Sequence, residues 1–190
     1  MYRHMFAALS IASIVGLAAP APARAQEVTS KDAAAVITSG FVEDLGELEK
    51  KFVALADAFP QDKYTWRPMD GVRSVSEVLM LAAFEGYSFV PNSFGAKAAD
   101  LGSRDEMAKL RTLSDKAQVT DHVKKGFAYA KQQLAGLDAA TLTAKRKVMG
   151  QDLTVVQIAD GIAGDLHEHL GQLIAYARIN GIKPPWTRGK

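Results

Sequence analysis

Apolar side chains recur at helical spacing near the start of this chain. From about Lys31 they form a stripe whose members are separated alternately by four and three residues: Phe41, Leu45, Leu48, Phe52, Leu55 and Phe59. A stripe of this period lies along one face of a helix that packs against other helices. Pro60 cannot continue the helix, so the pattern predicts a helix over residues 31–59.

A second helix is predicted to begin at Ser74. Glu77 follows three residues later, and this pair is typical of a capping box, in which each side chain binds a free backbone N–H group. The helical pattern continues to about Pro91. Residues 92–114 are mixed, with polar runs and two glycines, so we expect a long connection there, with one short helix over residues 104–110.

The remaining apolar pattern predicts two more helices. One covers residues 115–135, and a basic turn region over residues 145–152 separates it from the next. The last helix begins at Thr154, with Gln157 completing another capping box, and ends near Asn180. We found no strand-like alternation of useful length, so the sequence predicts an all-α four-helix bundle. A connection as long as the one after the second helix suits a crossover between distant ends of such a bundle.

The first 25 residues have the organisation of a secretory signal peptide. A basic start at Arg3 is followed by an apolar run over residues 5–19 and by the small-residue site Ala23-Arg24-Ala25. We expect cleavage there, export to the periplasm, and a mature bundle of residues 26–190 with no stable membrane span. The alternative is an uncleaved anchor, although the apolar run is shorter than the roughly 20 residues that a span needs.

Charge and cysteine content exclude several kinds of function. The chain has 23 basic and 21 acidic residues, and the two extra basic residues are Arg3 and Arg24 in the predicted signal peptide. A mature protein with balanced charge lacks the basic face that nucleic-acid binding requires. With no cysteine, the chain has no disulfide, thiolate nucleophile or cysteine-ligated metal. A small-molecule or protein partner stays open, and Ala-rich helix faces would permit a homodimer.

The last predicted helix carries the most informative chemistry. Asp165 and His169 are four residues apart, so both project from the same side of the helix. We place His169 near the centre of the apolar face and Asp165 near its edge. Such a pair is either half of a site for a divalent metal or a buried pair in which the carboxylate fixes the histidine tautomer. His167 points away from this face, and His122 is expected at the surface.

Motifs in two parts of the chain resemble those of the DinB-like (DinB/YfiT) superfamily. They are Trp66-Arg67-Pro68, the run Val72 to Val78 entering the second helix, His169-Leu170-Gly171-Gln172, Tyr176-Ala177-Arg178, Gly181 and Pro184-Pro185. The resemblance implies an up-down-down-up bundle that holds a metal with three histidines, one from the second helix and two, spaced i and i+4, from the fourth. It also implies an activity of the thiol-dependent transferase or metal-dependent hydrolase type, although many members have no known activity.

The sequence departs from that family pattern at two of the three ligand positions. Leu81 and Asp165 stand where the family has histidine, and His169 alone matches. Glu85 lies one turn after Leu81, so Glu85, Asp165 and His169 could form an altered set of ligands for Zn, Ni or Mn. Two hypotheses follow. The protein is a binding or interaction bundle that has lost the metal, or it is a metal-dependent transferase or hydrolase with an altered site.

Overall fold

The protein is built almost entirely of helices in a computed structural model, which describes residues 30–186. The predicted all-α class is confirmed. The long helical segments are α1 (Lys31–Ala58), α2 (Val75–Phe84) continued by the π-helical turn η2 (Glu85–Phe89) and α3 (Val90–Phe94), α5 (Lys116–Ala135) and α7 (Val155–Ile179). The signal peptide predicted for residues 1–25 lies outside the described residues.

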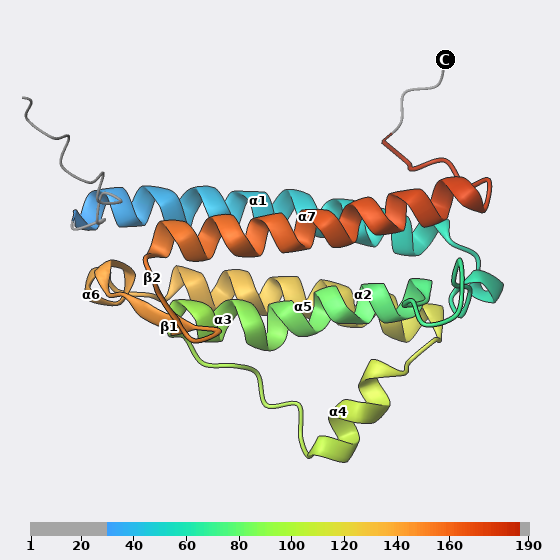
Figure 1. Ribbon diagram of the computed structural model, residues 1–190, viewed down its shortest axis with the longest axis horizontal. Helices are drawn as coiled ribbons and strands as arrows, with labels where there is room; N and C mark the ends of the chain where they lie inside the picture. Colours follow the sequence, from blue (N-terminus) through green and yellow to red (C-terminus); the bar gives the residue numbers. More distant parts are fainter. Residues whose placement is uncertain (1–29, 187–190) are drawn as a thin grey trace, which may run out of the picture.

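These segments lie in two layers. Figure 1 shows α1 beside α7 in one layer, with α2 and α5 in the other, and both α1 and α2 contact α5 and α7. The colours show that α1 and α7 run in one direction, whereas α2 and α5 run in the opposite direction. Between α3 and α5 the chain returns along the length of the molecule. This crossover carries α4 (Arg104–Arg111), which has no buried residue, lies outside both layers in Figure 1 and contacts α2.

The ends of the helices follow local sequence rules. Both predicted capping boxes are present: Ser74 with Glu77 begins α2, and Thr154 with Gln157 begins α7. A third box, of Ser103 with Glu106, begins α4. Each box binds backbone N–H groups that lack partners in the first helical turn, so these residues determine where the helices start.

The segment between α5 and α7 differs from the prediction. Instead of a plain basic turn, it forms a hairpin of β1 (Arg146–Val148) and β2 (Gln151–Leu153), preceded by the short helix α6 (Ala139–Thr143). Its two turn residues, Met149 and Gly150, have φ values of 49° and 83°. Positive φ at both central residues matches the type I′ turn of two-residue hairpins. The strands, of three residues each, were too short to show in the sequence pattern.

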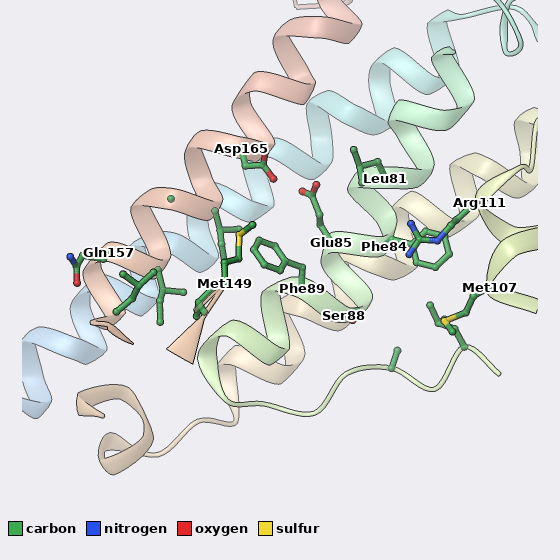
Figure 2. A pocket seen from close by; sticks show the side chains of 17 residues that line it. Leu81, Phe84, Glu85, Ser88, Phe89, Met107, Arg111, Met149, Gln157 and Asp165 are labelled. Carbon is green, nitrogen blue, oxygen red and sulfur yellow. The ribbon is translucent and has the colours of Figure 1, made fainter. Parts of the chain in front are cut away.

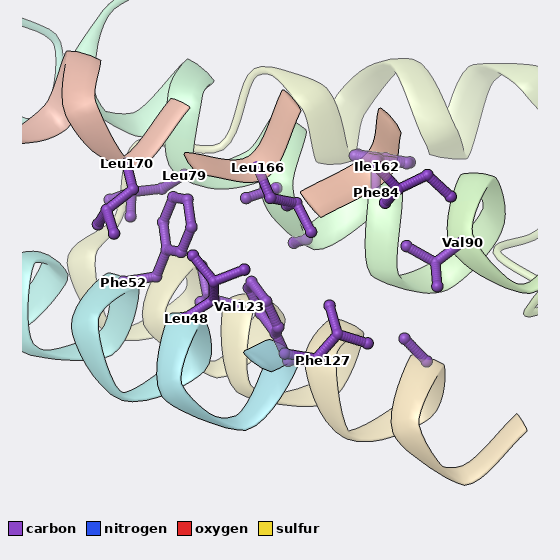
Figure 3. Packing of buried hydrophobic residues seen from close by; sticks show 14 of the residues in the cluster. Leu48, Phe52, Leu79, Phe84, Val90, Val123, Phe127, Ile162, Leu166 and Leu170 are labelled. Atoms are coloured by element: carbon purple, nitrogen blue, oxygen red, sulfur yellow. The ribbon is translucent and has the colours of Figure 1, made fainter. Parts of the chain in front are cut away.

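One continuous hydrophobic core lies between the two layers. All six residues of the predicted α1 stripe are at most 5% exposed. They pack with apolar residues of α2, α5 and α7, as Figure 3 shows for Phe52, Leu79, Phe127 and Leu166. Among residues 30–186, no helix combines the length and the apolar character required to cross a membrane.

Two glycines allow close contact between α5 and the segment formed by α2 and η2. A Cβ atom built on Gly86 would lie 2.4 Å from the backbone of Gly126, and one on Gly126 would lie 2.4 Å from the carbonyl oxygen of Ala83. Real Cβ atoms do not approach other atoms so closely. The contact of α2 and η2 with α5 therefore requires glycine at both positions, and it lies directly beside Glu85.

Candidate functional site

Glu85 begins a π-helical turn whose origin is visible in the sequence. Pro91 has no N–H group, so it cannot donate to the carbonyl of Tyr87 four residues earlier. That carbonyl instead accepts a hydrogen bond of 2.8 Å from the N–H group of Ala99 in the crossover. The helix widens over the same residues, and the N–H group of Val90 bonds to the carbonyl of Glu85. Such π turns within α-helices are frequent at functional sites.

The structure brings Glu85, Asp165 and His169 together. The Nε2 atom of His169 lies 3.2 Å from Oε1 of Glu85 and 3.6 Å from Oδ1 of Asp165. One ligand atom from each residue lies within 4.8 Å of the others. Figure 2 shows the carboxylates of Glu85 and Asp165 pointing toward each other from α7 and the segment that faces it. We call these three residues the acidic-histidine group.

Glu85 is the buried member of the acidic-histidine group. Its side chain is 7% exposed, and its Oε2 atom has no hydrogen-bond partner among the described residues. Burial, together with the nearby charge of Asp165, raises the pKa of the Glu85 carboxyl, although the hydrogen bond with His169 opposes this change. A buried carboxylate oxygen without a partner is costly, so Oε2 is an atom at which a cation or a hydrogen-bond donor would be stabilising.

The pKa of His169 is raised by the two carboxylates beside it. The hydrogen bond with Glu85 raises the pKa of the imidazole, while partial burial and the charge of Arg73 oppose this rise. His169 is less central on the apolar face than predicted. Leu166 and Leu170, which are 1% and 4% exposed, also belong to that face, whereas the His169 side chain is 15% exposed and contacts Glu85.

These residues could hold a metal ion. Bonds of about 2.1 Å to a tetrahedral ion place two ligand atoms about 3.4 Å apart. The separations of 3.2 Å and 3.6 Å around His169 bracket this value. Imidazole nitrogen and carboxylate oxygen are also established ligands for divalent metals. Leu81, which stands where the resemblance implies a histidine, has no ligand atom, and Glu85 supplies one from the next turn.

A cavity of about 650 Å³ adjoins the acidic-histidine group. Glu85 and Asp165 are its acidic lining residues, and most of the remaining wall is apolar. In Figure 2, Phe89 and Met149 lie to one side of Glu85, and Phe84, Met107 and Arg111 lie to the other. The volume falls within the range of typical small-molecule sites, which are mostly apolar with a few polar groups.

The two other histidines singled out in the sequence lie away from the cavity. His167 is exposed, as expected, and its Nε2 atom is 3.2 Å from both carboxylate oxygens of Asp44. His122 was predicted at the surface, but it is partly buried and its Nδ1 atom lies 3.2 Å from the Tyr87 hydroxyl. His122 is therefore partly exposed, as a surface residue is, but the Tyr87 hydroxyl covers one side of its ring.

Sequence reasoning missed the cavity and two residues at its ends. Arg111 belongs to the crossover helix α4, and Met149 to the hairpin turn. Neither position carries a motif, because the cavity forms only when these two connections fold over α2 and α7. The signal that was available is the pair Met149-Gly150, since glycine favours the second position of a tight hairpin turn.

Replacing Glu85 and His169 is expected to change how the free energy of unfolding depends on pH in chelator-treated protein. The pKa values of Glu85 and His169 are both raised above 4.5 and 6.5, their ordinary values. The folded state then binds more protons than the unfolded state, so these groups make the protein less stable as pH rises from about 4.5 through and beyond 6.5.

Urea unfolding at several pH values would test this expectation. We expect the free energy of unfolding of the unmodified protein to fall relative to that of the double variant Glu85→Gln/His169→Gln as pH rises from 5 to 8. Val36→Ser, at an exposed position on α1 that carries no titratable group, serves as the control and should leave the profile unchanged. A difference that moves toward the unmodified protein would contradict the pKa directions.

Comparisons with protein-family models, curated proteins and solved structures found no match.

Proposed function

We propose that the protein is a metal-dependent hydrolase or transferase whose divalent ion is held by Glu85, Asp165 and His169. The observation that carries this proposal is the buried Oε2 atom of Glu85, which has no partner among the described residues and lies in a group of suitably spaced ligand atoms. A divalent ion would offset the two carboxylates and supply the contact that Oε2 lacks.

Three protein ligands would leave part of a metal's coordination open, and two of the three residues, Glu85 and Asp165, line the cavity. An ion held there acts as a Lewis acid toward a carbonyl group or water. The two carboxylates and one imidazole limit the candidates to ions that accept mixed oxygen and nitrogen ligands, such as Zn, Mn or Ni. His169 must be neutral to bind, so metal affinity should increase with pH.

The resemblance to the DinB-like superfamily supports the same proposal. His169 and Asp165 occupy the family's ligand positions on α7, and Glu85 approaches His169 from the turn that follows Leu81. Glu85 thus replaces the ligand lost at Leu81. Export to the periplasm, inferred from residues 1–25, is part of the proposal, and assembly as a homodimer stays a prediction.

Elemental analysis of the mature chain tests the proposal directly. The protein is expressed from Gln26 without a histidine tag and purified without chelators. We expect about one divalent metal ion per chain, or uptake of one ion on titration with Zn, Mn or Ni. Protein that stays metal-free in all three titrations would refute the proposal and favour a metal-free binding bundle.

The two histidines of α7 provide a matched pair of variants. His169→Ala should abolish uptake because it removes the shared ligand of the group. His167→Ala should retain full uptake, since His167 contacts Asp44 on a different side of the helix. Equal uptake by both variants would place the metal elsewhere.

A further inference from the structure

The cavity next to the acidic-histidine group has chemically different ends. Its apolar end is formed by the hairpin and the start of α7, with Val148, Met149, Leu153 and Ile158 in the wall. Its other end, in the crossover, contains Arg111, the one basic residue among residues 30–186 that lines the cavity. Figure 2 places Glu85 and Asp165 between Met149 and Arg111.

Met149 is held in an unusual position. Its φ of 49° lies in the left-handed region, which is unfavourable for residues other than glycine. Its side chain is 88% exposed although it lines the cavity. The hairpin turn thus presents a large apolar side chain at the open edge of the cavity. Apolar ligand surface is the chemistry that such a side chain would cover.

Arg111 is held at the opposite end by an aromatic contact. Its guanidinium carbon lies 4.4 Å from the ring centroid of Phe84, a cation–π arrangement. A second hollow of about 400 Å³ meets the cavity at Leu81, Phe84 and Arg111, and adds Arg67 and Arg73. Arg67 is bonded to Glu77, so Arg73 and Arg111 contribute the surplus positive charge of this end.

We propose that the cavity binds a small carboxylate with an apolar chain or ring. The carboxylate contacts Arg111, the apolar part lies against Met149 and its neighbours, and the middle of the molecule faces the acidic-histidine group. This inference rests on the proposed function in one respect. A bound divalent ion offsets the charges of Glu85 and Asp165, which would otherwise repel an anion.

Calorimetric titration with octanoate, octanol and octylamine tests the assignment, because these probes share one chain and differ in head-group charge. The zinc-loaded or manganese-loaded chain should bind octanoate about tenfold more tightly than octanol, the contribution of one charge-assisted hydrogen bond, and octylamine least. Arg111→Ala should remove the preference for octanoate over octanol. Arg104→Ala, at the exposed start of the same helix α4, should retain it.

The apolar end has a separate test. Met149→Ser should weaken octanoate and octanol alike by about fourfold or more, the effect of one buried methylene group. Val36→Ser, at an exposed apolar position on α1, should change neither. Equal binding of octanoate by the unmodified protein and Arg111→Ala would overturn the inference, as would a preference for octylamine in metal-loaded protein.

The failure of this inference is distinguishable from failure of the proposed function. A chain that takes up one metal ion but does not discriminate between octanoate and octanol would overturn the inference alone. A chain that takes up no metal but prefers octanoate through Arg111 would overturn the proposed function and leave the carboxylate site standing.

Discussion

Gly126→Ala is expected to destabilise the protein strongly, although alanine is the better helix former. The new Cβ atom would lie 2.4 Å from the Ala83 carbonyl oxygen, and 3.0 Å from two further backbone atoms of that residue. Backbone cannot rotate away as a side chain can, so α5 and α2 must separate. Overpacking of this kind costs about 1–3 kcal/mol, which lowers the melting temperature by several degrees in a domain of this size.

Gly171→Ala is the matched control for this prediction. Gly171 lies within α7, and a Cβ atom built there meets nothing within 4 Å. The substitution should stabilise the protein by up to about 1 kcal/mol through helix propensity alone. Thermal and urea unfolding of both variants would show opposite shifts. A neutral Gly126→Ala variant would mean that α2 and α5 are not in contact through this glycine.

The same contact links the core to the site. Ala83 and Gly86 flank Glu85, so a displacement of this segment changes the position of the Glu85 carboxylate relative to His169 on α7. Gly126→Ala should therefore also weaken metal uptake without touching the acidic-histidine group. The helical packing and the candidate site are parts of one arrangement.

The helices were predictable because their signals are local. The stripe from Phe41 to Phe59 reports one buried face, and the hydroxyl–carboxylate pair Ser74 and Glu77 marks a helix start through contacts three residues apart. The pairing of Asp165 with His169 also follows from helical spacing. These features depend only on residues that are close in the sequence, so one sequence is enough to recognise them.

The rest of the site depends on contacts between distant segments. Glu85 was identified as a possible ligand, but nothing local shows that α7 would bury it. The hairpin turn at Met149 and the position of Arg111 above Phe84 also arise only when the connections fold over the helices. His169 was placed too near the centre of its face, because spacing alone did not show that Leu170 shares that face.

Glu85→Gln is expected to produce two effects of opposite sign. In chelator-treated protein near pH 8 it should raise the free energy of unfolding by about 1–3 kcal/mol, because an amide replaces a buried carboxylate that has an unpartnered oxygen. It should also lower metal affinity more than about 100-fold. Loss of a residue that only supports a ligand already costs about 10–100-fold, and Glu85 is a direct ligand in the proposed site.

The combination separates a ligand from a structural ion pair. If Glu85 served mainly to stabilise the fold through His169, its replacement would lower stability and leave metal uptake unaffected. Asp165→Asn is the control, because the Asp165 side chain is 44% exposed: it should weaken metal binding with little gain in stability. Calorimetry measures the stability of the two variants, and metal titration measures their affinity for the ion. Together the two measurements show whether Glu85 acts as a metal ligand. A Glu85→Gln variant that gains stability without metal and loses the ion would identify Glu85 as a metal ligand rather than a structural residue.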